Sequence, residues 1–92
     1  MNKLDVYNEL NKELINLNII DKEVWVSKHF NNSNNITSEK DIYVCLVTDE
    51  QISEMDLSDA IFGNDILNKL DLIIVISTKD KFKENDVLTK II

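Results

Sequence analysis

The chain has 92 residues and a formal net charge of −7 at pH 7, which predicts one small acidic domain spanning residues 1–92. This much negative charge argues against direct binding to nucleic acid and against docking on an anionic membrane surface. All ten residues of the Lys and Arg class are lysines, so the chain lacks the bidentate arginine fork that recognises phosphates and guanine edges.

The first predicted element is an amphipathic helix over residues 2–18. Leu10, Leu14 and Leu17 recur at helical spacing and form an apolar stripe. Asn18 is the expected residue in left-handed conformation at the end of this helix, because asparagine tolerates positive φ angles.

Two strands are predicted next. Residues 23–30 alternate imperfectly, with valines on one face and Trp25 on the other, which favours an edge strand with one wet side. Residues 41–48 form a nearly continuous apolar run and predict an interior strand. An asparagine-rich loop at residues 31–35 separates the two strands, and the connection is compatible with an antiparallel hairpin.

Residues 50–69 carry helical apolar spacing and predict a crossover connection. A break at Gly63 would divide it into two helices, with Asn64 or Asp65 capping the second. A strand, a helical crossover and a further strand form a βαβ unit, so we expect the strands on either side, 41–48 and 71–77, to be parallel.

The most apolar stretch of the chain lies in residues 70–77. Leucine and β-branched residues follow one another from Leu72 to Ile76 without alternation, which is typical of a strand covered on both faces. We therefore predict an interior strand at residues 71–77, with Ile74 fully buried beside Val44.

Residues 84–92 end the chain with apolar side chains spaced for a short helix, and a final edge strand is the alternative. The resulting order, α-β-β-α-β-α, predicts an α/β domain, with α+β as the alternative class. The expected sheet has three or four strands, mixed in direction, with parallel central strands and helices packed on it.

The most informative candidate for function is an acidic crossover. Between residues 49 and 71 there are seven acidic residues and a single lysine, Lys69. A negative surface of this kind can dock on a basic groove, including one that normally holds nucleic acid. The alternative is a solvated helix face whose acids cap two helix starts. The candidate contact residues are Asp49, Glu50, Glu54, Asp56, Asp59, Asp65 and Trp25, and Asp71 completes the acidic run.

A magnesium site is a weaker hypothesis. Asp49 and Glu50 directly follow a predicted parallel strand, and ligand sites in open α/β sheets lie at the carboxyl ends of strands. With Asp80 they could gather around Mg²⁺. The sequence has no glycine-rich phosphate loop, so we predict no metal and no cofactor.

The nucleophile candidates favour structural roles. His29 could act as a general base for Ser27 or Cys45, but no motif arranges these residues as a triad. Cys45 is the only cysteine, which excludes an intramolecular disulfide, and its apolar neighbours predict a buried, inert thiol. The chain has no signal-peptide core and no run of transmembrane length, so a cytoplasmic protein is expected.

Trp25 is the only tryptophan. In the interior, Trp25 would cover the sheet. On the surface, it would be a hot spot that contributes much of the binding energy of an interface.

Together these features predict a small acidic binding protein without enzymatic activity. We expect an inhibitor that docks residues 49–71 on the basic, nucleic-acid-binding groove of a partner protein, of the phage anti-defence or toxin-immunity type by analogy of size and charge. The alternatives are an interaction subunit that forms a homodimer through an apolar sheet edge or helix face, and a small magnesium-dependent enzyme.

Overall fold

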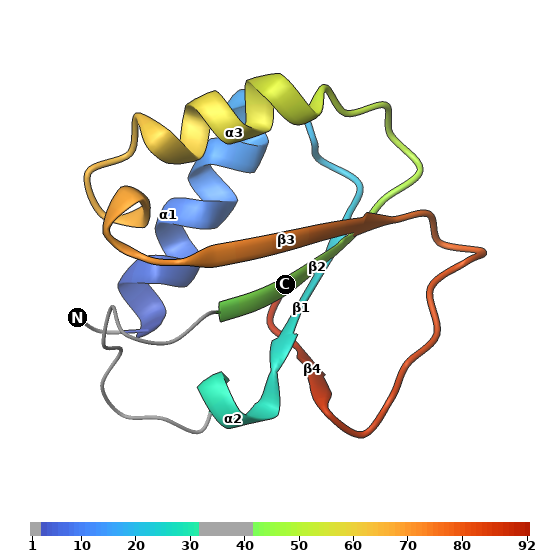
Figure 1. Ribbon diagram of the computed structural model, residues 1–92. Coiled ribbons are helices and arrows are strands. Elements are labelled where there is room, and N and C mark those ends of the chain that lie inside the picture. Colours follow the sequence, from blue (N-terminus) through green and yellow to red (C-terminus); the bar gives the residue numbers. More distant parts are fainter. Residues whose placement is uncertain (1–2, 32–41) are drawn as a thin grey trace.

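The computed structural model describes residues 3–31 and 42–92 and shows two layers, helices against a sheet (Figure 1). The described elements are α1 (Lys3–Asn16), β1 (Glu23–Ser27), α2 (Lys28–Asn31), β2 (Ile42–Val47), α3 (Glu54–Phe62), the 3₁₀ turn η1 (Leu67–Lys69), β3 (Leu72–Ser77) and β4 (Leu88–Lys90). The four-stranded sheet has the order β3-β2-β1-β4. The predicted mixed α/β architecture is therefore confirmed.

Helix α1 follows the predicted apolar stripe, with Leu10 and Leu14 buried against the sheet. The helix ends where Asn18 adopts a φ of 63°. The N–H of Ile19 then donates to the carbonyl oxygen of Leu14 at 2.9 Å, which closes the last turn in the manner of a Schellman motif. The predicted role of Asn18 is confirmed.

Strands β1 and β2 form the predicted antiparallel hairpin, with Trp25 opposite Cys45. The expected strand over residues 23–30 is too long, however, because β1 stops at Ser27. The predicted edge position is also wrong, because β1 lies between β2 and β4. The hydroxyl of Ser27 accepts a hydrogen bond from the N–H of Phe30 at 3.3 Å, so it caps the single turn α2. This turn brings the Phe30 ring into the core, 5.9 Å from the ring of Tyr7.

The crossover between β2 and β3 consists of two helical pieces, as expected. After α3 the Asn64 side-chain oxygen accepts hydrogen bonds from the N–H groups of Ile66 and Leu67, at 2.9 and 3.0 Å, which starts the turn η1. The crossover returns the chain parallel to β2, with Val44 opposite Ile74. The predicted parallel pair is confirmed.

The predicted interior position of residues 71–77 is wrong. Strand β3 is at the edge of the sheet, where Val75 is 54 % exposed and Ile73 37 % exposed. Ile74 is only half-buried, whereas we expected it to be fully buried. The reason is the path of the final segment, which pairs with β1 on the far side of the sheet and leaves β3 with one neighbour.

The helix predicted at residues 84–92 is also wrong, and the alternative of a final edge strand is right. Strand β4 runs antiparallel to β1, with Leu88 opposite Ser27 and Lys90 opposite Trp25. The asparagine-rich loop predicted at residues 31–35 lies, apart from Asn31, outside the described residues.

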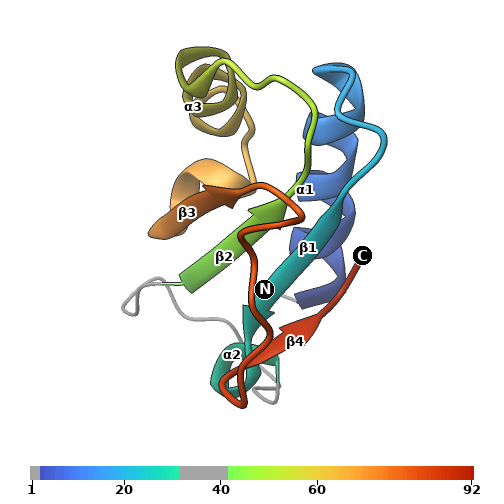
Figure 2. The ribbon, with the colours of Figure 1, turned by 90° about the vertical axis from the view of Figure 1, so that its right-hand side faces the viewer.

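The two faces of the sheet differ in how they are covered. Helices α1 and α3 lie on one face, while residues 78–87 cross the other (Figure 2). The core lies between the helices and the first of these faces, where Val24, Val44 and Leu46 are almost fully buried. Across the opposite face, the Trp25 ring lies 5.1 Å from the ring of Phe82.

The core position of α1 is tested by two neighbouring residues. Leu14 is 1 % exposed and Ile15 is 47 % exposed. Leu14→Ala should lower the free energy of unfolding by about 2–5 kcal/mol, because it removes buried surface and leaves a cavity. Ile15→Ala should change it by less than about 1 kcal/mol. Urea unfolding measures both variants, and equal losses would contradict the orientation of α1.

Candidate functional site

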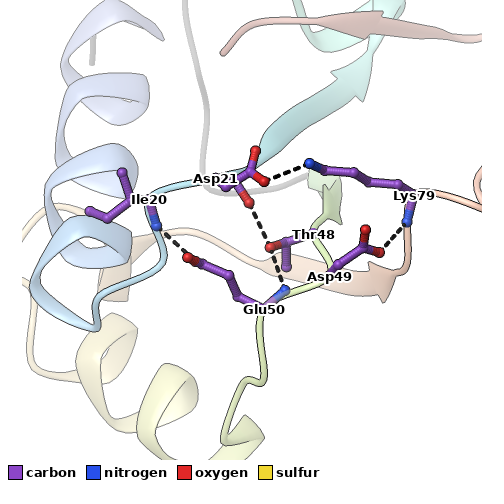
Figure 3. Close-up of polar contacts among 6 residues, drawn as sticks. All are labelled: Ile20, Asp21, Thr48, Asp49, Glu50 and Lys79. Atoms are coloured by element: carbon purple, nitrogen blue, oxygen red, sulfur yellow. Dashed lines mark hydrogen bonds and ion pairs between the residues drawn. The ribbon is translucent and has the colours of Figure 1, made fainter.

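Polar groups beyond the carboxyl ends of β2 and β3 join three loops (Figure 3). The hydroxyl of Thr48, which directly follows β2, donates to the carbonyl oxygen of Asp21 at 2.7 Å and accepts from the N–H of Glu50 at 3.0 Å. Thr48 is 2 % exposed, so these bonds are largely removed from competition with water. They hold the α1–β1 loop against the turn that leaves β2.

Two carboxylates of the predicted acidic surface belong to this network. The Glu50 carboxylate accepts from the N–H of Ile20 at 2.8 Å, and the Asp49 carboxylate accepts from the N–H of Lys79 at 3.0 Å. The ammonium of Lys79 in turn donates to the Asp21 carboxylate at 2.7 Å, and this hydrogen bond raises the pKa of Lys79. Asp49 and Glu50 therefore brace loops as well as carrying charge.

Each of the three acids of the hypothetical magnesium site, Asp49, Glu50 and Asp80, accepts a hydrogen bond from the protein. Asp80 accepts a hydrogen bond from the hydroxyl of Thr78 at 2.6 Å, which lowers the pKa of its carboxyl group. Asp49 and Glu50 each accept a backbone N–H. Within residues 3–31 and 42–92, no group of three or more His, Cys, Asp or Glu side chains is arranged to hold a metal ion.

The nucleophile candidates lie on different elements. Ser27 caps α2 with its hydroxyl oxygen, and His29 is exposed on the same turn. Cys45 is half-buried on β2, where burial raises the pKa of its thiol. A raised thiol pKa lowers the thiolate fraction at neutral pH, which is the opposite of nucleophile activation.

Trp25 is 8 % exposed and packs against Phe82. The structure therefore favours the interior alternative for this residue. Its indole N–H is buried and has no hydrogen-bond acceptor in the part of the chain that the structure describes.

The remaining predicted contact acids are on and after α3. Glu54, Asp56 and Asp59 are exposed along the helix, and Asp65 is exposed in the turn that follows. None of the four forms an ion pair with another described residue. Leu57, 4 % exposed, anchors the opposite side of the helix in the core.

Helix α3 is capped at its start by a residue that the sequence reading did not single out. The Ser53 hydroxyl accepts a hydrogen bond from the N–H of Asp56 at 3.3 Å. The first-turn acids Glu54 and Asp56 also interact favourably with the positive end of the helix dipole. The local signal was present, because a serine directly before a helical apolar pattern is a typical N-cap.

A groove of about 750 Å³, lined by both polar and apolar side chains, separates α3 from the free edge of β3. Its walls include Ser58 and Phe62 of α3 and the strand residues Leu72, Ile74 and Ile76. The groove was not predicted from the sequence, because an interior position was expected for β3.

The comparisons with known proteins add no family to this picture. No protein-family model matches the chain, and no curated protein or solved structure matches it at a significant level. In the described parts of the chain, no helix is both long and apolar enough to cross a bilayer.

The Thr48 network is tested by replacing its hydroxyl. Thr48→Val keeps the side-chain shape but leaves the Asp21 carbonyl and the Glu50 N–H without their partner. We expect a loss of about 1–3 kcal/mol in the free energy of unfolding. Thr89→Val on β4 is the matched control, because the Thr89 hydroxyl forms no hydrogen bond with any described residue. Equal urea midpoints for the two variants would contradict the structural role of the network.

The environment of Cys45 predicts slow thiol chemistry. With a raised pKa and partial cover, the native thiol should react with iodoacetamide at pH 7.5 at least about tenfold more slowly than free cysteine. Addition of denaturing urea should remove the difference. Native labelling as fast as that of free cysteine would contradict the position of Cys45 on β2.

Proposed function

We propose that this chain is a non-enzymatic binding protein that docks an acidic surface on a basic groove of a partner protein. The observation that carries the proposal is the set of acids on α3, Glu54, Asp56 and Asp59, which are exposed and form no ion pair with a described residue. Asp65 extends this surface beyond the helix. These four residues are called the α3 acidic surface below.

The α3 acidic surface is presented by a well-anchored element. Leu57 is buried beneath the helix, and Ser53 caps its start. At the other end, the Asn64 amide donates to the Glu9 carboxylate of α1 at 2.9 Å. An ordered surface loses less conformational entropy on binding than a flexible acidic loop would, and this supports specific recognition of a partner.

The charges on α3 have the chemistry of a nucleic-acid mimic. Asp56 and Asp59 are three residues apart and so lie on neighbouring positions of one helix face. Carboxylates repeated on a rigid helix can occupy the sites where a basic groove holds phosphates. An inhibitor of a nucleic-acid enzyme, of the phage anti-defence kind, or an immunity protein that neutralises a toxin would both work in this way.

A magnesium-dependent enzyme is the weaker candidate. The carboxylates that suggested it, Asp49, Glu50 and Asp80, already accept hydrogen bonds from the protein. An interaction subunit is the stronger alternative, because exposed apolar side chains gather beside α3 and β3.

The proposal is tested by reversing charge away from the helix start. Asp59→Lys with Asp65→Lys changes the surface by four charge units and leaves Glu54 and Asp56 to stabilise the first turn. The matched control is Glu84→Lys with Asp86→Lys, two exposed acids in the segment before β4. A partner is first captured from a lysate of the cells that encode the chain, or of the host bacterium where a phage encodes it. The partner is then purified.

The first pair of reversals should weaken binding to that partner about tenfold or more, and the control pair should weaken it less than threefold. Binding of the wild type should also weaken steeply between about 50 and 300 mM salt, since the Debye length shortens over this range. Equal losses from both pairs would show that only net charge is sensed. An unchanged affinity for the first pair would overturn the role of the α3 acidic surface.

A further inference from the structure

We propose that the free edge of β3 pairs with the same strand of a second copy, so that the chain forms a two-fold symmetric dimer with one continuous sheet. The dimer does not depend on the function of the α3 acidic surface. It rests on three features of β3 and its surroundings: a strand edge whose backbone groups bond to no described residue, a groove whose walls include Leu72, Ile74 and Ile76, and exposed apolar side chains on β3 and on α3.

The unpaired edge follows from the hydrogen bonds of the parallel ladder. The N–H of Ile42 donates to the carbonyl oxygen of Asp71, and the N–H of Thr48 donates to that of Ser77. Odd-numbered residues of β3 therefore point their backbone groups towards β2, and even-numbered residues point theirs outward. The outward groups belong to Leu72, Ile74 and Ile76, and none of them bonds to another described residue.

The edge also lacks the usual protection against pairing. Natural edge strands carry lysines, prolines or bulges that discourage a further strand. Strand β3 reads Leu-Ile-Ile-Val-Ile-Ser and has no charged residue. Such an edge accepts an additional strand readily.

Exposed apolar residues lie on both faces beside the β3 edge, some on α3 and some on the open face of the sheet. Five large apolar side chains that are at least 37 % exposed belong to α3, β2 or β3: Tyr43, Met55, Phe62, Ile73 and Val75. Phe62 is 81 % exposed and Met55 74 % exposed, although both belong to a helix that packs on the core. Single exposed apolar residues are ordinary, but several of them beside an open strand edge indicate an interface.

A second copy of β3 satisfies the edge completely. With Ile74 opposite Ile74 of the second copy, Leu72 faces Ile76 of the second copy, and every outward N–H and C=O of one strand meets one of the other. On the open face, the same register places Ile73 opposite Val75 of the second copy. All directly opposed pairs within the strand are then apolar, and the strand brings no charge into the interface.

The helices fit the same symmetry. The two-fold axis of an antiparallel strand pair is perpendicular to the sheet, so both α3 helices lie on one face and run antiparallel beside the axis. The side of α3 that borders the groove carries Ser58 and Phe62, and Met55 lies on nearly the same side of the helix, two turns before Phe62. The groove of each copy is thus filled by the α3 helix of the other copy, through the side that carries Phe62.

Charge arrangement agrees with a second copy as the occupant. Asp56 and Asp59 do not line the groove, so these two acids of each copy stay in water. Glu54 and Asp71 do line the groove, but the antiparallel arrangement keeps the two copies of each residue at opposite ends of the interface. The net charge of −7 on each copy still opposes association at long range. Dimerisation should therefore become stronger as salt rises, whereas binding to a basic partner should become weaker.

Analytical ultracentrifugation of the full chain tests the proposal, since a 10.7 kDa monomer separates clearly from its dimer. The dissociation constant of the wild-type dimer should fall at least about threefold between 50 and 500 mM NaCl. Val75→Lys should raise it at least about tenfold, because it places a charge on the paired edge. Val87→Lys is the matched control: it makes the same change at a valine that is 66 % exposed and lies outside β3.

The contact between the two α3 helices is tested with Phe62→Gln, which should also raise the dissociation constant of the dimer. Its control is Ile20→Gln, at a residue that is 62 % exposed and lies outside α3, and this change should leave the dissociation constant unaltered. Hydrogen exchange distinguishes strand pairing from a dimer held by α3 alone. The amides of Leu72, Ile74 and Ile76 should exchange fast at low protein concentration and become protected as concentration rises. Those of Ile73 and Val75 should be protected throughout, because they bond to β2.

Three results would overturn the proposal. A wild type that stays monomeric at 1 mM protein and 500 mM NaCl would show that the edge does not bind a second copy. Val75→Lys and Val87→Lys dimerising equally would place the interface elsewhere. Fast exchange of the Ile74 amide in a confirmed dimer would exclude strand pairing. None of these outcomes bears on the charge-reversal test of the α3 acidic surface.

Discussion

The fold depends on the fact that the described chain supplies only two helices longer than a single turn, and that both cover the same face of the sheet. One face can therefore be sealed by α1 and α3, whereas the other is covered only where residues 78–87 cross it. The apolar core lies between the first face and the helices because burying apolar side chains there is the main source of stability. The uncovered part of the second face is the part formed by β2 and β3, where Tyr43 and Val75 are exposed.

The path of the final segment determines which strand edge is exposed to solvent. Because this segment crosses the sheet and adds β4 beside β1, strand β3 keeps a free edge. A strand with five consecutive apolar residues, Leu72 to Ile76, thus keeps an accessible edge. Such an edge is usually protected by charge or covered by another element, and a second copy of β3 would provide that cover while leaving Asp56 and Asp59 free.

The acidic residues near β2 and α3 divide into two groups that a count of charges does not separate. Asp49 and Glu50 lie in the turn after β2, where backbone N–H groups of two other loops reach their carboxylates. Asp56 and Asp59 follow within ten residues, but they lie on the outer side of a helix whose buried side is fixed by Leu57. Acceptance of a backbone N–H stabilises the fold, whereas carboxylates in water remain available to a partner.

The sequence by itself determined the local features: α1 and its end at Asn18, the two-part crossover with its cap at Asn64, and the directions of β1, β2 and β3. These follow from apolar periodicity, capping chemistry and connection length, which act over a few residues or one supersecondary unit. Tertiary structure alone decided that β3 is an edge, that residues 88–90 form a strand, and that Asp49 and Glu50 brace loops. An apolar run has the same sequence pattern whether one or two strands flank it, so the pattern does not predict an edge position. The carboxylates of Asp49 and Glu50 accept from N–H groups thirty residues away, so local sequence does not predict these bonds.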